Sequence, residues 1–282
     1  MKVIYNFSSV KYEFSGHPES PSRIKIIYES LKDKFEIEEY SQGLDYEEIL
    51  KVHTRDLFEK VKNGEFIDYD TPNNKEMFRY AVLSVGSALK CVEYLLKGER
   101  SFSLSRPPGH HALKDRAGGF CYFNNIGIAV NKILENGKKV LILDLDVHHG
   151  NGTEDIFLDR ENVLYVSIHQ SPLYPGTGLK NISNSYNFPL PPGTDIKTYM
   201  EKLEEIEKIL KDFSPDYLAI SLGLDTLDTD PLGGFALKWS DFYEIGKKIY
   251  SWGVPLFVVL EGGYGPDIGR ACREFLRGVD GR

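Results

Sequence analysis

The sequence predicts one α/β domain over residues 1–282, with a central, mainly parallel sheet and helices on both faces. Two observations support this fold class. Short apolar runs typical of strands alternate along the chain with longer segments of helical periodicity, as they do in parallel sheets with crossover helices. Of the 282 residues, 41% are hydrophobic, and we find no low-complexity linker or internal repeat that would divide the chain.

The individual elements are expected from their periodicity. Short apolar runs predict strands near residues 2–5, 101–105, 139–147, 163–168, 216–223 and 255–260. Apolar residues spaced three and four apart predict helices near residues 22–33, 45–62, 74–97, 124–136, 196–212, 240–250 and 267–277. The later strands each end in a polar group. Because open parallel sheets bind ligands at the carboxyl ends of their strands, we expect the functional site at that edge.

The composition excludes several classes of function. A net charge of −8 argues against stand-alone nucleic-acid binding but is compatible with a basic substrate such as a lysine side chain or an amine. No apolar stretch approaches the roughly 20 residues that span a bilayer, and residues 1–5 lack the apolar core of a signal peptide. The three cysteines are scattered, as in a reducing compartment. We therefore expect a cytoplasmic protein without a nucleic-acid or membrane partner; its oligomeric state stays open.

Two carboxylates and two imidazoles lie within the sequence DLDVHHG at the end of predicted strand 139–147. Alternate side chains of a strand share one face, so Asp144, Asp146 and His148 are expected to point into one site. Burying several ionisable groups costs free energy unless they are paired or bind a metal. An exposed polar strand end is the alternative interpretation. The tandem histidine and the apolar residues before it favour a metal site.

Further polar groups follow other predicted strands. A second tandem pair, His110 and His111, follows a Pro-Pro-Gly turn that restricts the backbone. Asp225 alone would be interpreted as the N-cap of a helix, but beside Asp146 and His148 it becomes a candidate third ligand. Two carboxylates and one imidazole suit a hydrolytic zinc site with an open position, and they also suit Fe(II) or Co(II).

Seven pieces of the sequence resemble the histone deacetylase superfamily, which also contains acetylpolyamine amidohydrolases and acetoin-utilisation proteins. The pieces are HPESPSRI at 17–24, RPPGHHA at 106–112, GGFCYFNN at 118–125, DLDVHHGNGT at 144–153, YPGTG at 174–178, DPLGGF at 230–235 and EGGYG at 261–265. They extend nearly from end to end of the chain, and few unrelated families would carry them in this order. The resemblance implies a single domain with an eight-stranded, mainly parallel sheet similar to that of arginase.

The resemblance implies two metal sites. Asp146, His148 and Asp225 match the ligands of a catalytic zinc ion. A structural monovalent cation, usually potassium, is implied beside it. Its oxygen ligands would come from Asp144, Ser167 and Ile168, with main-chain oxygens of Asp146 and His148.

The resemblance also implies the catalytic groups. His110 and His111 match the tandem catalytic histidines, and Asp144 matches the carboxylate that orients the first of them. The partner of the second is Asn151, which is similar to the class II branch and should leave His111 less basic than a carboxylate would. Tyr264 matches the tyrosine whose hydroxyl stabilises the oxyanion; a packed surface tyrosine is the alternative for an isolated Gly-Gly-Tyr.

A substrate tunnel is implied as well. Phe120 and Tyr174 match its aromatic walls, Gly119 belongs to the same wall segment, and Leu232 matches the rim. Without the neighbouring pieces, core packing would be the preferred interpretation of both rings. A polyamine-preferring relative carries Glu at the position of Leu232, and the run 53–71 leaves no room for the dimerisation insertion of many acetylpolyamine amidohydrolases. Both departures leave the substrate open.

The sequence therefore predicts a zinc-dependent amidohydrolase that removes acetyl or other short acyl groups from lysine side chains of proteins. The alternative is the same chemistry on small acetylated amines such as acetylpolyamines. Two further interpretations are less favoured. One is a non-catalytic acyl-lysine binding module. The other is a ureohydrolase-like enzyme, which is disfavoured because the ligands of only one metal are evident. Which tandem histidine acts as base and which as acid stays open.

Overall fold

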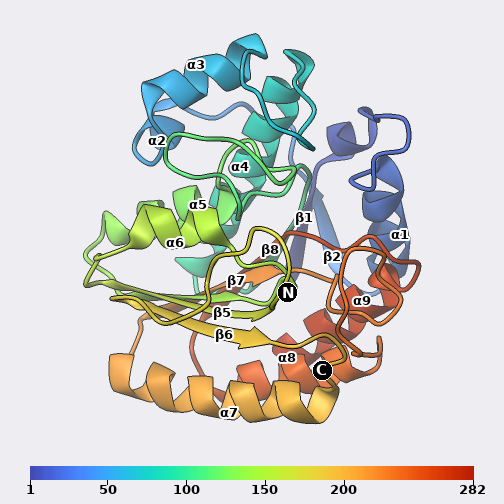
Figure 1. Cartoon of the computed structure of the whole chain (residues 1–282), viewed down its shortest axis with the longest axis vertical. Helices are drawn as coiled ribbons and strands as arrows, with labels where there is room; N and C mark the ends of the chain where they lie inside the picture. Colours follow the sequence, from blue (N-terminus) through green and yellow to red (C-terminus); the bar gives the residue numbers. More distant parts are fainter.

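The computed structural model describes residues 1–282 and contains one eight-stranded sheet with helices on both faces (Figure 1). The strands are β1 (Lys2–Tyr5), β2 (Glu36–Glu39), β3 (Ser101–Leu104), β4 (Val140–Asp144), β5 (Val163–Gln170), β6 (Ser185–Leu190), β7 (Tyr217–Leu222) and β8 (Leu256–Leu260). Their order in the sheet is β2-β1-β3-β8-β7-β4-β5-β6, and all neighbouring pairs are parallel. The predicted fold class and the eight strands are confirmed.

Helices cover both faces of the sheet (Figure 1). They are α1 (Pro21–Leu31), α2 (Glu47–Leu50), α3 (Arg55–Asn63), α4 (Glu76–Leu95), α5 (Asn125–Leu134), α6 (Asn151–Phe157), α7 (Ile196–Phe213), α8 (Asp241–Ser251) and α9 (Ile268–Val279), with a 3₁₀ helix at Phe7–Val10. Leu141 and Leu143 of β4 pack in the core with α1, α7, α8 and α9, whereas Val140 and Ile142 pack with α4, α5 and α6. None of the helices combines the length and apolar composition needed to cross a membrane.

Periodicity alone missed the strands β2 and β6 and the short helix α6, and it divided the helices incorrectly in one place. β2 and β6 are the two edges of the sheet. Edge strands have one bonded neighbour, so they tolerate the charges of β2 and Pro189 of β6, which weaken the sequence signal. The predicted helix 45–62 is two helices, α2 and α3. Thr54 separates them because its hydroxyl caps α3, accepting a hydrogen bond from the Leu57 amide (3.2 Å).

Strand β4 is shorter than predicted, and this corrects one inference about the site. It ends at Asp144, not at residue 147, because the Asp146 amide donates to Asp144 Oδ1 (3.2 Å) and the chain bends there. Strand alternation therefore does not bring Asp144, Asp146 and His148 together. The Asp144 carboxylate turns towards His110 and Tyr165, while Asp146 and His148 lie in the bend that follows.

The sheet order places the polar strand ends side by side. Strands β3, β8, β7 and β4 are consecutive neighbours in the sheet. Each is followed by a polar segment: the tandem histidines after β3, the 261–265 segment after β8, Asp225 after β7, and the Asp146–His148 bend after β4. Because all four strands run in the same direction, these segments meet at one edge of the sheet.

Candidate active site

Asp146, His148 and Asp225 form a compact group at this edge. Their potential ligand atoms all lie within 4.8 Å of one another. His148 Nδ1 lies 3.0 Å from Asp146 Oδ1 and 3.2 Å from Asp225 Oδ2. Both carboxylates are fully buried, and the His148 side chain is 13% exposed. Three ligand atoms of this kind can hold one divalent cation and leave a position open.

Backbone amides hold the two carboxylates in place. The Val147 amide donates to Asp225 Oδ1 (2.9 Å), and the Gly262 amide donates to Asp146 Oδ2 (2.8 Å). A Cβ atom on Gly262 would lie 2.6 Å from Asp146 Oδ2 and even closer to Asp225 Oδ2, so only glycine brings its amide to this point. The orientation of both carboxylates is thus set by the neighbouring strand ends.

The charges of this group fit a bound cation. Burial and the nearby Asp146 carboxylate together raise the pKa of Asp225 to about 7. Asp225 Oδ2 is buried, and its 3.2 Å contact with His148 Nδ1 lacks the geometry of a hydrogen bond. Burial lowers the pKa of His148, but its contacts with Asp146 and Asp225 outweigh burial and raise that pKa to about 10. A positive ion between these side chains would satisfy the unpaired oxygen and relieve the repulsion between the carboxylates.

The tandem histidines lie beside this group and have different partners. Their ring centroids are 4.0 Å apart. His110 Nδ1 lies 3.2 Å from Asp144 Oδ2, whereas His111 Nδ1 lies 2.8 Å from the amide oxygen of Asn151. His110 Nε2 is 3.8 Å from Asp146 Oδ2 and faces the candidate metal group. Each ring is therefore oriented through Nδ1, and the first Nε2 is turned to the site.

The different partners give the two imidazoles opposite electrostatics. Burial lowers the pKa of His110, but the Asp146 and Asp144 carboxylates outweigh burial and raise it to about 10. Burial lowers the pKa of His111 well below its ordinary value, and the neighbouring imidazoles lower it further. The amide of Asn151 offers an acceptor without a full charge, so it compensates less than a carboxylate would. This direction agrees with the expectation from the sequence.

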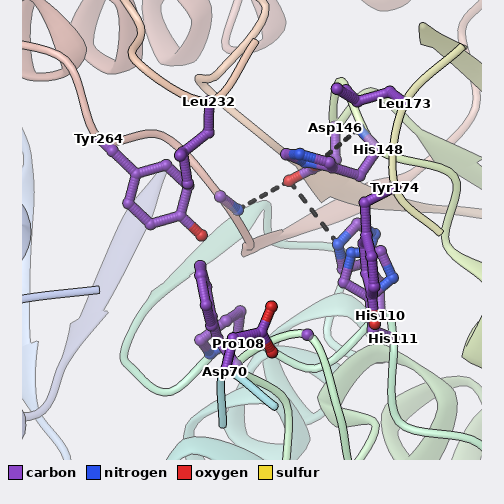
Figure 2. A pocket seen from close by; sticks show the side chains of 13 residues that line it. Asp70, Pro108, His110, His111, Asp146, His148, Leu173, Tyr174, Leu232 and Tyr264 are labelled. Carbon is purple, nitrogen blue, oxygen red and sulfur yellow. Dashed lines mark hydrogen bonds and ion pairs between the residues drawn. The ribbon is translucent and has the colours of Figure 1, made fainter. Parts of the chain in front are cut away.

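A pocket of about 250 Å³ opens onto these residues (Figure 2). Its lining is Asp70, Pro108, His110, His111, Gly119, Phe120, Asp146, His148, Leu173, Tyr174, Leu232, Gly262 and Tyr264. In Figure 2 the Tyr264 hydroxyl points into the pocket, and the tandem histidines lie across the pocket from it. The structure thus brings Gly119, Phe120, Tyr174 and Leu232, all predicted to contact substrate, into the same pocket as the candidate catalytic groups.

The segment that carries Tyr264 is held by buried charged residues. The Tyr264 amide donates to Asp230 Oδ2 (2.6 Å), and the same carboxylate accepts from the Leu232 amide through Oδ1 (2.9 Å). The Arg23 guanidinium lies over the Tyr264 ring, 4.6 Å from its centroid. Gly263 adopts φ +114°, which a residue with a side chain rarely adopts. Burial raises the pKa of Tyr264 well above its ordinary value, so its hydroxyl stays a proton donor.

Two aromatic rings flank the pocket. Phe120 has a positive φ of 68°, a strained conformation for a side chain of this size, and its amide donates to Thr71 Oγ1 (2.8 Å). Its ring meets that of Tyr264 edge to face, with centroids 5.8 Å apart. The Tyr174 ring stands perpendicular to His111 at 5.0 Å, and the residue is 46% exposed. Neither ring is simply a core residue, because both contact the pocket.

The residues predicted to hold potassium lie behind the pocket. Asp144 of β4 pairs in register with Ser167 of β5, and Ile168 follows in the same strand. All three are fully buried. The Ser167 hydroxyl is hydrogen bonded to His169 Nδ1 (2.9 Å), and Asp144 Oδ2 accepts from the Tyr165 hydroxyl (3.0 Å). These residues are therefore brought together, but outside the pocket.

Four functional candidates were missed from the sequence. Asp70 and Leu173 line the pocket, and Asp230 and Glu261 bond to the segments that form it. Asp230 and Glu261 belong to pieces that carry the family resemblance, which was a usable signal. Asp70 lies in a loop without periodicity, and only the fold brings that loop to the pocket.

Comparisons with known proteins identify the family. Residues 17–278 match the family model of the histone deacetylase domain. The chain is 38% identical over 304 aligned positions to a probable deacetylase of Methanothermobacter thermautotrophicus, covering 100% of this chain and 91% of that protein. It is 40% identical over 215 positions to an acetylpolyamine amidohydrolase of Mycoplana ramosa, covering 71% of this chain but only 63% of that relative.

A solved structure has the same fold. The acetylpolyamine aminohydrolase of Burkholderia pseudomallei superposes with a TM-score of 0.92 at 26% identity, covering 99% of this chain and 98% of that one. The family match over most of the chain, the eight-stranded fold and the Asp/His/Asp group beside two histidines lead to one conclusion. The chain belongs to the histone deacetylase family and is a deacetylase that hydrolyses amides.

Proposed function

We propose that the enzyme deacetylates small N-acetylated amines that carry a second, positively charged amine, as acetylpolyamines do. One observation carries this choice of substrate: the Asp70 carboxylate lines the same pocket as the candidate metal group and the tandem histidines. An amine held by its acetyl end at these groups would extend its free end towards an acidic side chain. The names of the relatives from Mycoplana ramosa and Burkholderia pseudomallei support the same substrate class.

The Asp70 carboxylate has the charge needed for such a role. Burial and the neighbouring Asp68 carboxylate together raise the pKa of Asp70 to about 6. Asp70 is therefore mostly ionised above neutral pH. Asp68 accepts hydrogen bonds from the Asp70 and Thr71 amides (3.3 and 3.0 Å), so the loop holds two carboxylates close together. A substrate ammonium at this point would replace part of the repulsion between them with attraction.

The proposed chemistry is zinc-assisted hydrolysis of the acetyl amide. Asp146, His148 and Asp225 would hold the ion, which when bound would polarise the carbonyl and acidify water. One tandem histidine takes a proton from the attacking water, and the other gives a proton to the leaving amine. The Tyr264 hydroxyl donates to the developing oxyanion. We also propose that Asp144, Ser167 and Ile168 bind a structural potassium ion, since buried oxygens meet at the β4–β5 pair.

The test compares two substrates that differ by one charge. N-acetylputrescine and N-butylacetamide have similar carbon chains, but only the former carries an ammonium. We expect kcat/KM to be about 10-fold higher for N-acetylputrescine, and a chelator to abolish activity on both. Asp70→Asn should remove the preference without lowering kcat for N-butylacetamide. Equal kcat/KM for both substrates in the wild-type enzyme would refute the amine preference but leave deacetylation itself intact.

Acetyl-lysine in proteins is a second candidate substrate. The flat rings of Phe120 and Tyr174 on the pocket favour it as much as they favour an acetylated diamine, because both substrates present a linear methylene chain. An acetyl-lysine peptide should be assayed in parallel. A kcat/KM for the peptide well above that for N-acetylputrescine would select the protein substrate.

A further inference from the structure

Glu261 is a buried carboxylate that the proposed chemistry does not use. It follows β8 directly, is 1% exposed, and lies three residues before Tyr264. Its Oε2 accepts hydrogen bonds from the amides of Gly109 (2.7 Å) and His110 (3.1 Å), and its Oε1 accepts from the Ser221 hydroxyl (3.1 Å). Burying a carboxylate costs free energy unless it is paired or hydrogen bonded, and here three donors satisfy it.

The Glu261 hydrogen bonds connect the segments that follow β3 and β8, beyond the point where the backbone pairing of these two strands ends. The β3–β8 pairing ends at the Ser103–Val259 pair. Beyond it, the segment with the tandem histidines leaves β3, and the segment with Tyr264 leaves β8. The Glu261 side chain ties the first segment to the second through the amide of His110 itself. The amide of the next residue, Gly262, holds Asp146 of the candidate metal group (2.8 Å).

One short segment therefore touches three parts of the site. Residues 261–264 contact the histidine segment through a carboxylate, the candidate metal group through an amide, and the pocket through Tyr264. Their main chain is itself anchored, because Arg23 donates to the carbonyl oxygens of Glu261 (2.5 Å) and Gly263 (2.6 Å). A shift of the histidine segment relative to this anchor would change the distances between the candidate catalytic groups.

We propose that Glu261 is a positioning residue for amide hydrolysis: its carboxylate fixes the backbone of His110 relative to Asp146 and Tyr264. Glu261 acts through the length of its side chain and through the hydrogen bonds that its oxygens accept. The negative charge itself is not required. This inference goes beyond the substrate class proposed above, but it rests on the proposed acid–base role of the tandem histidines.

Two substitutions separate reach from charge. Glu261→Gln keeps the length, offers an amide oxygen to the Gly109 and His110 amides, and can donate to the Ser221 hydroxyl. Glu261→Asp keeps the charge but is one methylene shorter, by about 1.5 Å, and cannot serve both amides in place. Because a 1 Å misplacement costs about 100-fold, we expect kcat to fall about 100-fold in Glu261→Asp but within about threefold in Glu261→Gln. KM and metal content should change little in either.

Glu274→Asp is the matched control. Glu274 is another buried carboxylate, on α9, where it pairs with Arg273 and Arg277 away from the pocket. The same shortening there should lower Tm and leave kcat unchanged. Should Glu261→Asp fail to fold, Glu261→Met replaces it under the same criteria, since Met fills the volume without an acceptor oxygen.

Each result decides between named alternatives. The expected result is a kcat order of wild type, then Gln, then Asp, with the same loss on N-acetylputrescine and on an acetyl-lysine peptide. A lower kcat for Gln than for Asp would overturn the proposal in favour of charge. If Glu261→Asp lowers Tm but leaves kcat unchanged, Glu261 stabilises the fold and does not position the catalytic groups. A His110→Ala variant with full activity would instead refute the acid–base role on which the inference rests.

Discussion

The two ends of the pocket are built differently. The floor, defined as Asp146, His148, Asp225, His110 and His111, lies at the ends of three sheet strands and is almost completely buried. Its carboxylates accept hydrogen bonds from backbone amides of neighbouring strand ends. The mouth, defined as Asp70, Phe120, Tyr174 and Leu232, comes from four separate loops, and Tyr174 is 46% exposed.

This difference separates the reaction from the choice of substrate. Groups at the floor must hold their geometry to a fraction of an ångström, and packed strand ends supply that rigidity. Loops at the mouth can change their side chains without disturbing the sheet. We therefore expect substitutions at the floor to abolish turnover on every substrate, whereas substitutions at the mouth should change preference and leave kcat nearly intact.

The largest effect is expected from Asp225→Asn at the floor. It keeps the oxygen that accepts from the Val147 amide but removes the ligand charge, so bound metal and activity should be lost together, with kcat falling about 1000-fold or more. Metal analysis of the purified protein alongside kinetics measures both. Asp228→Asn, on an exposed residue three positions away, is the control. Full metal occupancy in Asp225→Asn would remove Asp225 from the ligand set.

The next effect is expected from Tyr264→Phe, which keeps the ring between floor and mouth but deletes the hydroxyl. If the hydroxyl stabilises the oxyanion, kcat should fall about 100-fold while metal content stays intact and KM changes less. Tyr250→Phe on α8 tests the general cost of losing a tyrosine hydroxyl. Near-wild-type turnover in Tyr264→Phe would mean that the ring only packs.

A smaller effect is expected from Asn151→Asp, at the residue that orients His111 of the floor. A carboxylate beside His111 Nδ1 would stabilise the protonated imidazole, so the pKa of His111 should rise. The inflection of the pH–rate profile that this histidine controls should then move to higher pH by about one unit, whichever proton transfer it performs. Asn136→Asp, on an exposed residue, should leave the profile in place. An unshifted profile in Asn151→Asp would show that His111 does not control the rate.

The smallest effect is expected at the mouth. Leu232→Glu adds a second negative charge near Asp70 on the pocket lining, so KM for N-acetylputrescine should fall about threefold. The KM for N-butylacetamide should not change, and kcat should stay the same for both substrates. Leu96→Glu, on a residue that is 50% exposed, controls for added surface charge. A large drop in kcat would mean that the mouth shares the rigidity of the floor.

The contrast between floor and mouth also explains which site residues could be predicted. Asp146 and His148 are two residues apart in a rare polar cluster after an apolar run, so local sequence was enough to single them out. Their three-dimensional grouping with Asp225 needed only the rule that parallel strands end at one edge. Asp70 had no such signal, because a surface carboxylate in a loop is ordinary and its position depends on the fold of residues far along the chain.

The fold shows the same division between strong and weak local signals. Central strands such as β4 and β8 are buried on both faces, so their apolar runs were recognised. The edge strands β2 and β6 were missed because one bonded neighbour suffices to hold them, whatever their composition. The end of β4 was placed too late because the turn depends on the Asp144 side chain, which accepts from the backbone in place of a neighbouring strand.

The sequence by itself determined the fold class, the family and the identity of the polar groups at the floor, because periodicity and closely spaced motifs are local properties. The resemblance also implied the pairs His110–Asp144 and His111–Asn151, which the structure contains. Only the tertiary structure brought Asp70 to the pocket and joined Glu261 to the backbone of His110 across 151 residues of chain. These contacts depend on the order of the strands and on the paths of the loops, and the spacing of residues along one segment predicts neither.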